Sequence, residues 1–436
     1  MEASDFFAGT ACANLVRVPL FPRDSRQSWV HMLGHTQCRA LVTSEKFAEA
    51  LGPIQDELDD LEHVIVRGHD YEDWLTGQSD IDPDPPVDPD DYYVIRHTGG
   101  TTGRAKGVML SHQNLWFCGG SSNEASYVPG FTTAIVPLPL SHAFGLITTI
   151  VGLHTPEPAS AVLMRWFDPT AWLQLVQDQR VQRGAVVPSM VQILLGAPLE
   201  EYDLSSLRYL NCGAAPLSVE VANEFERRVP GVELCEGYGS TEAGAVVAVN
   251  RLGARKLGSV GPPIPGCEVR VVDEEDQALP VGGVGEICVR SPGVMLGYWK
   301  SPELSNETLK GGWLHTGDMG KVDDDGFVFI VDRKKDLIIR GGFNVFPRDV
   351  EDVLLEHPAV ALAGVVGKPD ERHGEEVVAF VQLRPGQEAT DEELIAFAKD
   401  RLGAYKYPRE VSILPMVPLT PVGKVDRKSL RTMLQA

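Results

Sequence analysis

The sequence lacks the features that mark secreted, zinc-binding and membrane-spanning proteins. Its seven cysteines are scattered along the chain and none forms a Cys-x-x-Cys pair, which favours a reduced protein without a disulfide framework or a structural zinc. No signal peptide precedes the globular body, and no run of about eighteen apolar residues could span a bilayer. From these absences we expect a cytoplasmic protein without a transmembrane segment, and peripheral contact with a membrane stays open.

Positive charge is also scarce. The chain carries 39 lysines and arginines against 61 aspartates and glutamates, a net charge of −22. Because no basic stripe is visible, we expect no nucleic-acid partner, and an anionic ligand would need a local basic site. The 436 residues exceed one core of the usual size, so the length predicts at least two domains.

One segment combines glycine, hydroxyl groups and positive charge. Residues 97–107 read His-Thr-Gly-Gly-Thr-Thr-Gly-Arg-Ala-Lys-Gly, in which successive backbone N–H groups can form a nest for an anion. The apolar run 92–95 predicts a strand before it, and Ser111 predicts a capped helix after it, as in phosphate-binding loops. The spacing of a Walker A loop is absent. The alternative is a flexible surface turn, which needs neither three threonines nor a lysine.

Alternating helical and strand-like segments indicate an α/β fold. They occur over 6–43, 168–196 and 207–228, and they argue for parallel strands with helices on both faces. We expect one strand at 16–20 and another at 40–43. The acidic, proline-rich stretch 78–91 predicts an exposed connector.

The pattern changes after residue 258. Short apolar runs between Gly, Pro and Asp turns predict an antiparallel β unit that ends at Val331. A dense charge cluster at 332–336 closes this unit, and the residues after it predict a compact α+β unit. We therefore place the domain boundary at the cluster, with domains 1–331 and 332–436.

Four polar sites can each be interpreted as functional or as purely structural. His142 lies between apolar runs, where a histidine more often packs than reacts. The loop 237–242, Gly-Tyr-Gly-Ser-Thr-Glu, offers a ring for a base, a donor for phosphate and an oxygen ligand for Mg²⁺, or it is a tight turn. Asp318 either caps a turn or binds ribose hydroxyls. Lys424 on its own would be a surface lysine.

Taken together and in order, these motifs resemble the adenylate-forming superfamily of acyl-CoA synthetases, adenylation domains of peptide synthetases and luciferases. The matching segments within 8–436 are 98–107, 237–242, 285–287 with 297–299, 316–318, 332–336 and 421–424. Each is a weak to moderate signal alone, and six in order are specific. The resemblance implies a large N-terminal domain of parallel α/β sheets plus a small β-barrel-like unit, followed by a small mobile α+β C-terminal domain.

The resemblance implies an acid–thiol ligase that works in two steps. A carboxylate attacks the α-phosphate of ATP and gives an acyl-adenylate and pyrophosphate, and a thiol then displaces AMP. ATP, Mg²⁺ and CoA are the implied cofactors. The protein would contribute mainly charge stabilisation and positioning.

The family's roles fall on particular positions of this sequence. The β- and γ-phosphates would be held by Thr98, Gly99, Gly100, Thr101, Thr102, Gly103 and Lys106. Adenine would lie among Gly213, Ala214, Ala215, Tyr238 and Gly239. Thr241 would contact the α-phosphate and Glu242 would hold Mg²⁺. Asp318 and Arg333 would bind the ribose. Lys424 would bridge the carboxylate and the α-phosphate, and the implied catalytic set is Lys424, Thr241, Glu242, His142 and Lys106.

The resemblance also implies a domain rotation between the two steps. Lys335 would be the hinge, and the CoA tunnel would be lined by Gly341, Gly342 and Phe343, since a residue without a side chain allows close approach. The acyl pocket would be formed by His142, Phe144, Ile147 and Thr148.

The sequence favours a medium- or long-chain fatty acid. Gly99, where many relatives have serine, and the segment 342–347 resemble bacterial fatty acyl-CoA ligases. Ile339 and Asn344 stand where plant coumarate–CoA ligases carry lysine and glutamine. The alternatives are an aryl or cinnamate-type acid, a carrier protein as the thiol, and an inactive nucleotide-binding homologue.

The resemblance starts partway into the family's first subdomain. Roughly 80–100 residues that relatives carry before the glycine loop have no counterpart, and missing strands would leave an exposed sheet edge and apolar face. We expect a homodimer contact or a local rearrangement to compensate for them.

Overall fold

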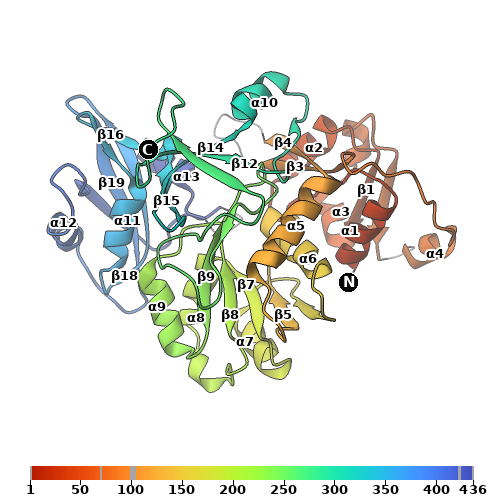
Figure 1. The fold of residues 1–436 in the computed structure, drawn as a ribbon, viewed down its shortest axis with the longest axis horizontal. Coiled ribbons are helices and arrows are strands. Elements are labelled where there is room, and N and C mark those ends of the chain that lie inside the picture. Colours follow the sequence, from red (N-terminus) through yellow and green to blue (C-terminus); the bar gives the residue numbers. More distant parts are fainter. Residues whose placement is uncertain (1, 69–70, 99–104, 421–423, 435–436) are drawn as a thin grey trace.

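The computed structural model describes residues 2–68, 71–98, 105–420 and 424–434 (Figure 1). The N-terminal residues and the C-terminal unit lie at opposite sides of the molecule, and the largest sheet lies between them (Figure 1). No helix within the described ranges is both long and apolar enough to cross a bilayer. The arrangement is mixed α/β, as predicted, with a large N-terminal part and a small C-terminal one.

The first part of the chain forms a small layer around two parallel strands. Its elements are α1 (Glu2–Cys12), α2 (Arg26–His35), β1 (Ala40–Ser44), α3 (Glu45–Leu51), the 3-10 turn η1 (Ile54–Glu57), β2 (His63–Arg67) and α4 (Tyr71–Thr76). β1 pairs with β2 in parallel, and Trp29, Leu33, Leu41, Leu51 and Ile54 form the core beside them. The strand expected at 16–20 is wrong, because that segment makes only an isolated bridge between Arg17 and Val94.

The glycine loop joins two antiparallel strands. β3 (Tyr92–Thr98) pairs with β4 (Lys106–Ser111), and β13 (Gly297–Tyr298) adds a third strand beside β4. The expected order of strand, loop and helix is therefore wrong, since β4 precedes α5 (His112–Ser126). The side chains of Val108 and Leu110 are buried. This burial favours a strand in the residues that follow the loop. Ser111 does cap α5, and it accepts a hydrogen bond from the N–H of Asn114.

A six-stranded sheet forms the centre of the molecule. Its order is β10 (Ala248–Val249), β9 (Glu233–Tyr238), β8 (Tyr209–Cys212), β7 (Arg183–Val186), β5 (Thr133–Val136) and β6 (Ser160–Leu163). All neighbours are parallel except β10 and β9. The helices are α6 (Ala143–Leu153), α7 (Pro169–Asp178), α8 (Pro188–Leu195) and α9 (Val219–Arg228), with the 3-10 turn η2 (Leu199–Glu201).

The two faces of this sheet differ in composition. Ile135, Val186 and Leu210 point to one face and pack with residues of α7, α8 and α9 in a large apolar core. Successive side chains of a strand alternate between faces, so Ala134, Arg183 and other small or polar residues belong to the opposite face. That second face borders the cavity described below.

The antiparallel β unit predicted after residue 258 is present. β11 (Glu268–Val272), β12 (Gly285–Arg290), β14 (Leu314–Val322) and β15 (Val328–Arg333) pair in that order. Only the short α10 (Pro302–Thr308) and the 3-10 turn η3 (Lys310–Gly312) lie within it.

The C-terminal residues form a separate α+β layer with its own core. Its elements are η4 (Lys334–Asp336), β16 (Ile338–Arg340), β17 (Phe343–Val345), α11 (Pro347–Leu355), β18 (Val360–Asp370), β19 (Gly374–Leu383), α12 (Asp391–Lys399), β20 (Glu410–Leu414) and α13 (Arg427–Met433). The sheet order is β17-β16-β19-β18, and β20 pairs with β19. Val345, Val350, Leu354 and Val365 are fully buried in this core. The unit that sequence periodicity predicts here is confirmed.

Candidate active site

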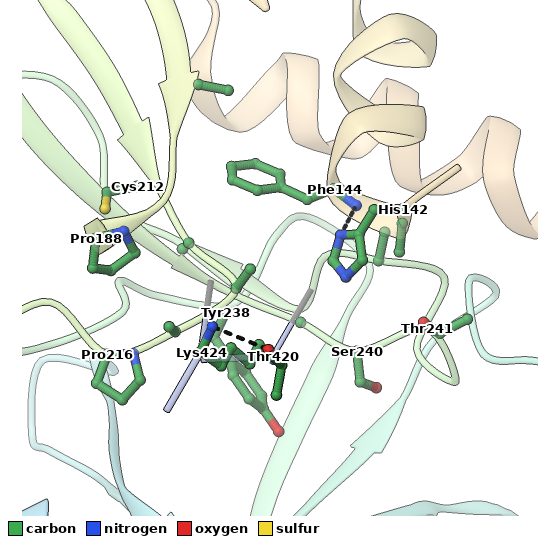
Figure 2. A pocket seen from close by; sticks show the side chains of 18 of the residues that line it. His142, Phe144, Pro188, Cys212, Pro216, Tyr238, Ser240, Thr241, Thr420 and Lys424 are labelled. Carbon is green, nitrogen blue, oxygen red and sulfur yellow. Dashed lines mark hydrogen bonds between the residues drawn. The ribbon is translucent and has the colours of Figure 1, made fainter. Parts of the chain in front are cut away.

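A cavity of about 1290 Å³ lies where the large sheet, the β unit and the C-terminal unit meet. Its walls come from the ends of β3 and β9, from α5 and α6, from β14 and β15, and from residues 419–420 and 424–428. Figure 2 shows His142 and Phe144 on one side, with Tyr238, Thr420 and Lys424 across from them. Segments far apart in the sequence therefore meet at one site.

Tyr238, Asp318 and Arg333 form a connected group in this cavity. The Tyr238 hydroxyl donates to Asp318 Oδ2 at 2.6 Å, and Arg333 Nε lies 3.0 Å from Asp318 Oδ1. Asp318 and Arg333 are paired across β14 and β15, so the sheet register fixes their contact. Burial, and then the Asp318 charge, raise the pKa of Tyr238, which keeps its hydroxyl a donor. The group offers a flat ring beside a carboxylate and a cation.

Hydroxyl groups from two distant strands donate hydrogen bonds to Glu242. Thr98 Oγ1 donates to Glu242 Oε1 at 3.4 Å, and the Tyr298 hydroxyl donates to the same oxygen at 3.2 Å. Lys106 Nζ lies 5.4 Å from the centre of the Tyr298 ring. The arrangement is a cluster of oxygen ligands with a lysine beside it, of the kind that suits Mg²⁺ and phosphate. Thr241 also lines the cavity.

The predicted adenine-binding residues lie in two adjacent loops. Gly213 follows β8, and a Cβ atom on it would lie 3.2 Å from the Gly237 carbonyl oxygen and 3.5 Å from the Phe144 ring. A Cβ on Gly239 would lie 1.9 Å from the Ala245 carbonyl oxygen, so no side chain fits there. Ala214 has a φ of 71°, a conformation that alanine rarely adopts and that often marks functional loops.

The central residues of the glycine loop, Gly99, Gly100, Thr101, Thr102 and Gly103, lie outside the described residues. Their predicted phosphate contacts stay a prediction. Thr98 and Lys106, which flank them, both line the cavity.

Lys424 reaches the cavity from the C-terminal end of the chain. Its backbone N–H donates to Thr420 Oγ1 at 3.1 Å, as drawn in Figure 2. Burial, and then the charges of Arg333 and Lys335, lower the pKa of the ammonium to about 8, although Asp318 and Glu242 oppose the shift. No ion pair within 4 Å holds the ammonium among the residues that the structure describes. A desolvated cation without a protein partner is suited to an anionic ligand.

The residues that follow Lys424 fix its place. Arg427 Nη2 lies 2.8 and 2.7 Å from the two carboxylate oxygens of Glu351, and Arg427 Nη1 lies 3.5 Å from Asp336 and 3.7 Å from Asp332. These carboxylates come from α11, from β15 and from the 3-10 turn η4 that follows it. The ion pairs therefore attach the lysine segment to the rest of the C-terminal unit.

His142, Phe144, Ile147 and Thr148 line the same cavity. His142 precedes α6, and its Nδ1 accepts a hydrogen bond from the Phe144 N–H at 3.3 Å. Burial, and then the charges of Arg96 and Lys424, lower the pKa of His142 to about 3, so the ring is neutral near pH 7. Its surroundings are apolar on the α6 side, where Ile147 is 2% exposed.

The predicted hinge residue lines the cavity, whereas the predicted CoA-tunnel residues do not. Lys335, in the 3-10 turn η4, lines it. Gly341, Gly342 and Phe343 do not, and they are exposed. Phe343 packs on Tyr405, with the ring centres 4.9 Å apart. The structure thus brings the terminal lysine to the site and leaves the glycine segment outside it.

Sequence reasoning missed two residues of this cavity. Tyr298 belongs to a quoted motif, but nothing in the sequence indicated its bond to Glu242. Arg96 lies in an otherwise apolar strand and is 3% exposed; it donates to the Ser141 carbonyl oxygen, while its Nε and Nη2 have no partner in the described chain. A charged residue within an apolar strand is the signal that could have identified it.

The sequence profile of AMP-binding enzymes matches residues 5–299, and that of the AMP-binding enzyme C-terminal domain matches residues 349–424. The two matches cover both parts of the molecule that meet at the cavity.

Curated relatives differ in the acid and thiol that their names give. The chain is 41% identical over 355 residues to a long-chain-fatty-acid–CoA ligase of Bacillus subtilis, spanning 79% of this chain and 62% of that protein. It is 34% identical to a fatty acid–[acyl-carrier-protein] ligase of Streptomyces coeruleorubidus, over 97% of this chain and 83% of the relative. It is 39% identical to a feruloyl-CoA synthase of an Amycolatopsis species, over 82% and 73% of the two chains.

Solved structures share the fold over nearly the whole chain. The ATP-bound MatB of Rhodopseudomonas palustris aligns with a TM-score of 0.91 at 29% identity, over 99% of this chain and 86% of that one. The amide bond synthetase McbA of Marinactinospora thermotolerans aligns with a TM-score of 0.89 at 32% identity, over 99% and 87%.

Proposed function

This chain belongs to the family of AMP-binding enzymes, as an acyl-CoA-synthetase-like protein of the adenylate-forming superfamily, and from that premise we propose that it activates a carboxylic acid with ATP and passes the acyl group to CoA. The products are acyl-CoA, AMP and pyrophosphate, the reaction of an AMP-forming acid–thiol ligase. The observation that carries this proposal is the buried ammonium of Lys424, which forms no ion pair within 4 Å with a described residue and shares one cavity with Glu242 and Asp318.

In the first step the protein binds, orients and shields charge. The Tyr238 ring would cover the adenine, while Asp318 and Arg333 would accept and donate hydrogen bonds at the ribose hydroxyls. Lys424 would lie between the acid's carboxylate and the α-phosphate, with Thr241 on the phosphate. Such a positioned cation lowers the cost of bringing two anions together and stabilises the charge that develops on the phosphate oxygens. Lys106 and Thr98 would hold the β- and γ-phosphates.

Glu242 fits a role in magnesium binding. Its carboxylate, with the hydroxyls of Thr98 and Tyr298 at 3.4 and 3.2 Å, supplies the hard oxygen ligands that Mg²⁺ prefers. When bound there, the ion would screen the negative charge of the triphosphate.

We place the domain boundary between residues 331 and 332 and the hinge at Lys335. Lys424 is inside the cavity while Gly341, Gly342 and Phe343 are outside it, so the described arrangement suits the acyl-adenylate step. Rotation about Lys335 would withdraw Lys424 and bring Gly341 to the thiol entrance for the second step, a hinge-type closure.

The acid is proposed to be a medium- or long-chain aliphatic one. Ile147 and the Phe144 ring give the cavity an apolar wall beside His142, and one relative is named for long-chain fatty acids. The carrier-protein thiol and the feruloyl group in the names of other relatives make these the alternatives to test.

The test is pyrophosphate release with ATP, CoA and a panel of C4–C18 aliphatic and aryl acids. We expect release with at least one aliphatic acid, and acyl-CoA as the second product. Binding of ATP without pyrophosphate release for every acid would refute the proposal and would favour a nucleotide-binding protein without turnover. Acyl transfer to a carrier protein but not to CoA would refute the choice of thiol.

A further inference from the structure

The far end of the cavity carries an arginine without an anion. The cavity floor is the face of the large sheet that bears Ala134, Ala185, Arg183 and Asn211, all of which line it. Resting on the proposed acid activation, we propose that the acid is a medium-chain dicarboxylate whose second carboxylate binds Arg183 and Asn211.

Arg183 is partly buried at the start of β7. Its Nε is buried and has no hydrogen-bond partner, and no ion pair or hydrogen bond joins its guanidinium to another residue of the described ranges. Burial lowers its pKa, and the neighbouring groups that oppose this shift are the phenols of Tyr209 and Tyr127, not carboxylates. Keeping a desolvated guanidinium unpaired is costly, so the site is suited to an anion that the protein itself does not supply.

Its neighbours are arranged as donors. Arg183 and Tyr209 are direct partners in the parallel pair β7–β8, and Asn211 follows on the same face beside Ala185. The Tyr209 hydroxyl donates to Asn211 Oδ1 at 2.8 Å, which leaves the Asn211 amide nitrogen as a donor. The Ser122 hydroxyl, which also lines the cavity, is buried without a partner. A guanidinium, an amide N–H and a hydroxyl together recognise a carboxylate better than a methyl end.

The spacing sets the length of the acid. Tyr209 is four residues before Gly213, which lies at the predicted adenine end, and strands rise about 3.3 Å per residue, so about 13 Å separate these two levels. The arginine side chain shortens the span that the ligand must cover. An extended chain advances about 1.2 Å per bond, so acids of roughly six to ten carbons would span the distance between these two levels.

Small residues keep this path open. Ala134 and Ala185 flank Arg183 along the floor, and Thr148 and Val151 of α6 line the opposite side of the cavity. These small and apolar side chains leave room for a methylene chain, and Arg183, Asn211 and Ser122 add polar groups to the lining of the same cavity. This distribution matches an acid with two charged ends and an apolar middle.

The experiment compares octanedioate with octanoate, two acids of equal length, in ATP–pyrophosphate exchange. We expect kcat/KM for octanedioate to exceed that for octanoate at least tenfold, because charge-assisted hydrogen bonds are lost with the methyl end. Arg183→Met should lower kcat/KM for octanedioate about 10- to 100-fold and leave or raise that for octanoate. Arg208→Met, which changes an exposed arginine at the edge of β8, is the matched control and should alter neither value.

Each possible outcome of this comparison either supports or overturns the inference. Equal or better use of octanoate by the unmodified protein overturns the inference even if Arg183→Met fails to fold, and the activity on fatty acids would still support the proposed function. If p-coumarate is activated with a higher kcat/KM than both aliphatic acids, the inference is overturned, and a phenol is the group that binds at Arg183. Should Arg183→Met not fold, Asn211→Leu is expected to show the same selective loss on octanedioate. Absence of exchange with every acid refutes the proposed function itself, and this inference with it.

Discussion

Lys424 is the residue whose environment is most unlike that of a surface lysine. It sits in a cavity with Arg333 and Lys335 nearby, and burial is the main reason that its pKa falls to about 8. A lysine with an ordinary pKa would stay charged through the whole working range of most enzymes. Here the charge that the first step needs is present below pH 8 and is lost above it.

We therefore predict an alkaline limb in the first half-reaction. The kcat/KM of ATP–pyrophosphate exchange for the free enzyme should fall tenfold per pH unit above a pKa near 8, because only the ammonium can bridge two anions. The measurement is a pH profile from 6.5 to 10 for the unmodified protein and for Lys424→Arg, whose guanidinium stays charged. Any residual activity of Lys424→Arg should lack this limb. A flat profile up to pH 9.5 in the unmodified protein would contradict the assignment.

Individual roles were harder to predict than individual motifs. The sequence indicates that Tyr238, Glu242, Asp318 and Lys424 belong to one kind of site, and the structure does bring them to one cavity. The sequence gives no sign that Arg96 Nε, Arg96 Nη2 and Arg183 Nε are buried without a hydrogen-bond partner among the described residues, since the pairing of a buried cation depends on distant segments. Arg96 lies between Ile95 and His97, and only the packing of Ser141 against it reveals its burial.

At the scale of elements, local signals predicted the helices and failed at the glycine loop. α9 lies within 207–228, where alternating helical and strand-like segments were expected, and it forms because Ser218 caps it and apolar residues recur with helical spacing. The strand β4 was missed because Lys106 and Gly107 look like part of the loop. They pair with β3 across that loop, and only the next two residues of β4 pair with the distant β13. β20 was missed because it is short and pairs in parallel with β19.

The ion pairs of Arg427 give a prediction at this scale. Arg427→Met would leave the buried carboxylates of Glu351, Asp332 and Asp336 without their shared cation, which should cost about 3–5 kcal/mol of unfolding free energy. The loss should appear in urea unfolding followed by far-ultraviolet circular dichroism, together with a fall in pyrophosphate exchange.

Arg431→Met is the matched control for that change. Among the described residues Arg431 forms an ion pair only with Asp336, at 2.7 Å, and its side chain is 37% exposed, so its removal should cost less than about 1 kcal/mol. Equal destabilisation by the two substitutions would show that the network around Arg427 does not hold the lysine segment.

For the whole molecule, two acidic side chains lie where the large and C-terminal units meet. Burial raises the pKa of Glu236 in β9 to about 7, with Arg348 of α11 opposing the shift. Burial likewise raises the pKa of Asp352, also on α11, to about 6, and Arg348 again opposes it. A carboxyl group with a raised pKa stabilises the docked arrangement while it is protonated. Docking should therefore weaken as the pH rises through 6 and 7.

We predict that the radius of gyration of the ligand-free protein depends on pH. Small-angle scattering of the ligand-free protein should show a radius of gyration that grows between pH 5.5 and 8, and Glu236→Gln should reduce this growth because its amide cannot ionise. Glu274→Gln, an exposed change in the turn after β11, should behave as the unmodified protein does. A radius that is constant with pH, or that shrinks, would contradict a role of these carboxyl groups in docking.

The central claim, that one cavity joins ATP and a carboxylic acid through Lys424, is tested most directly by separating the two half-reactions in Lys424→Ala. Formation of acyl-adenylate from ATP and acid should fall at least a thousandfold, since the cation at the developing charge is removed. Thioester formation from preformed acyl-adenylate and CoA should stay within about threefold of the unmodified rate, because the proposed rotation would withdraw Lys424 in that step. Lys399→Ala, an exposed lysine on α12, controls for changes to the C-terminal unit. Equal loss of both half-reactions, or no loss of the first, would contradict the account.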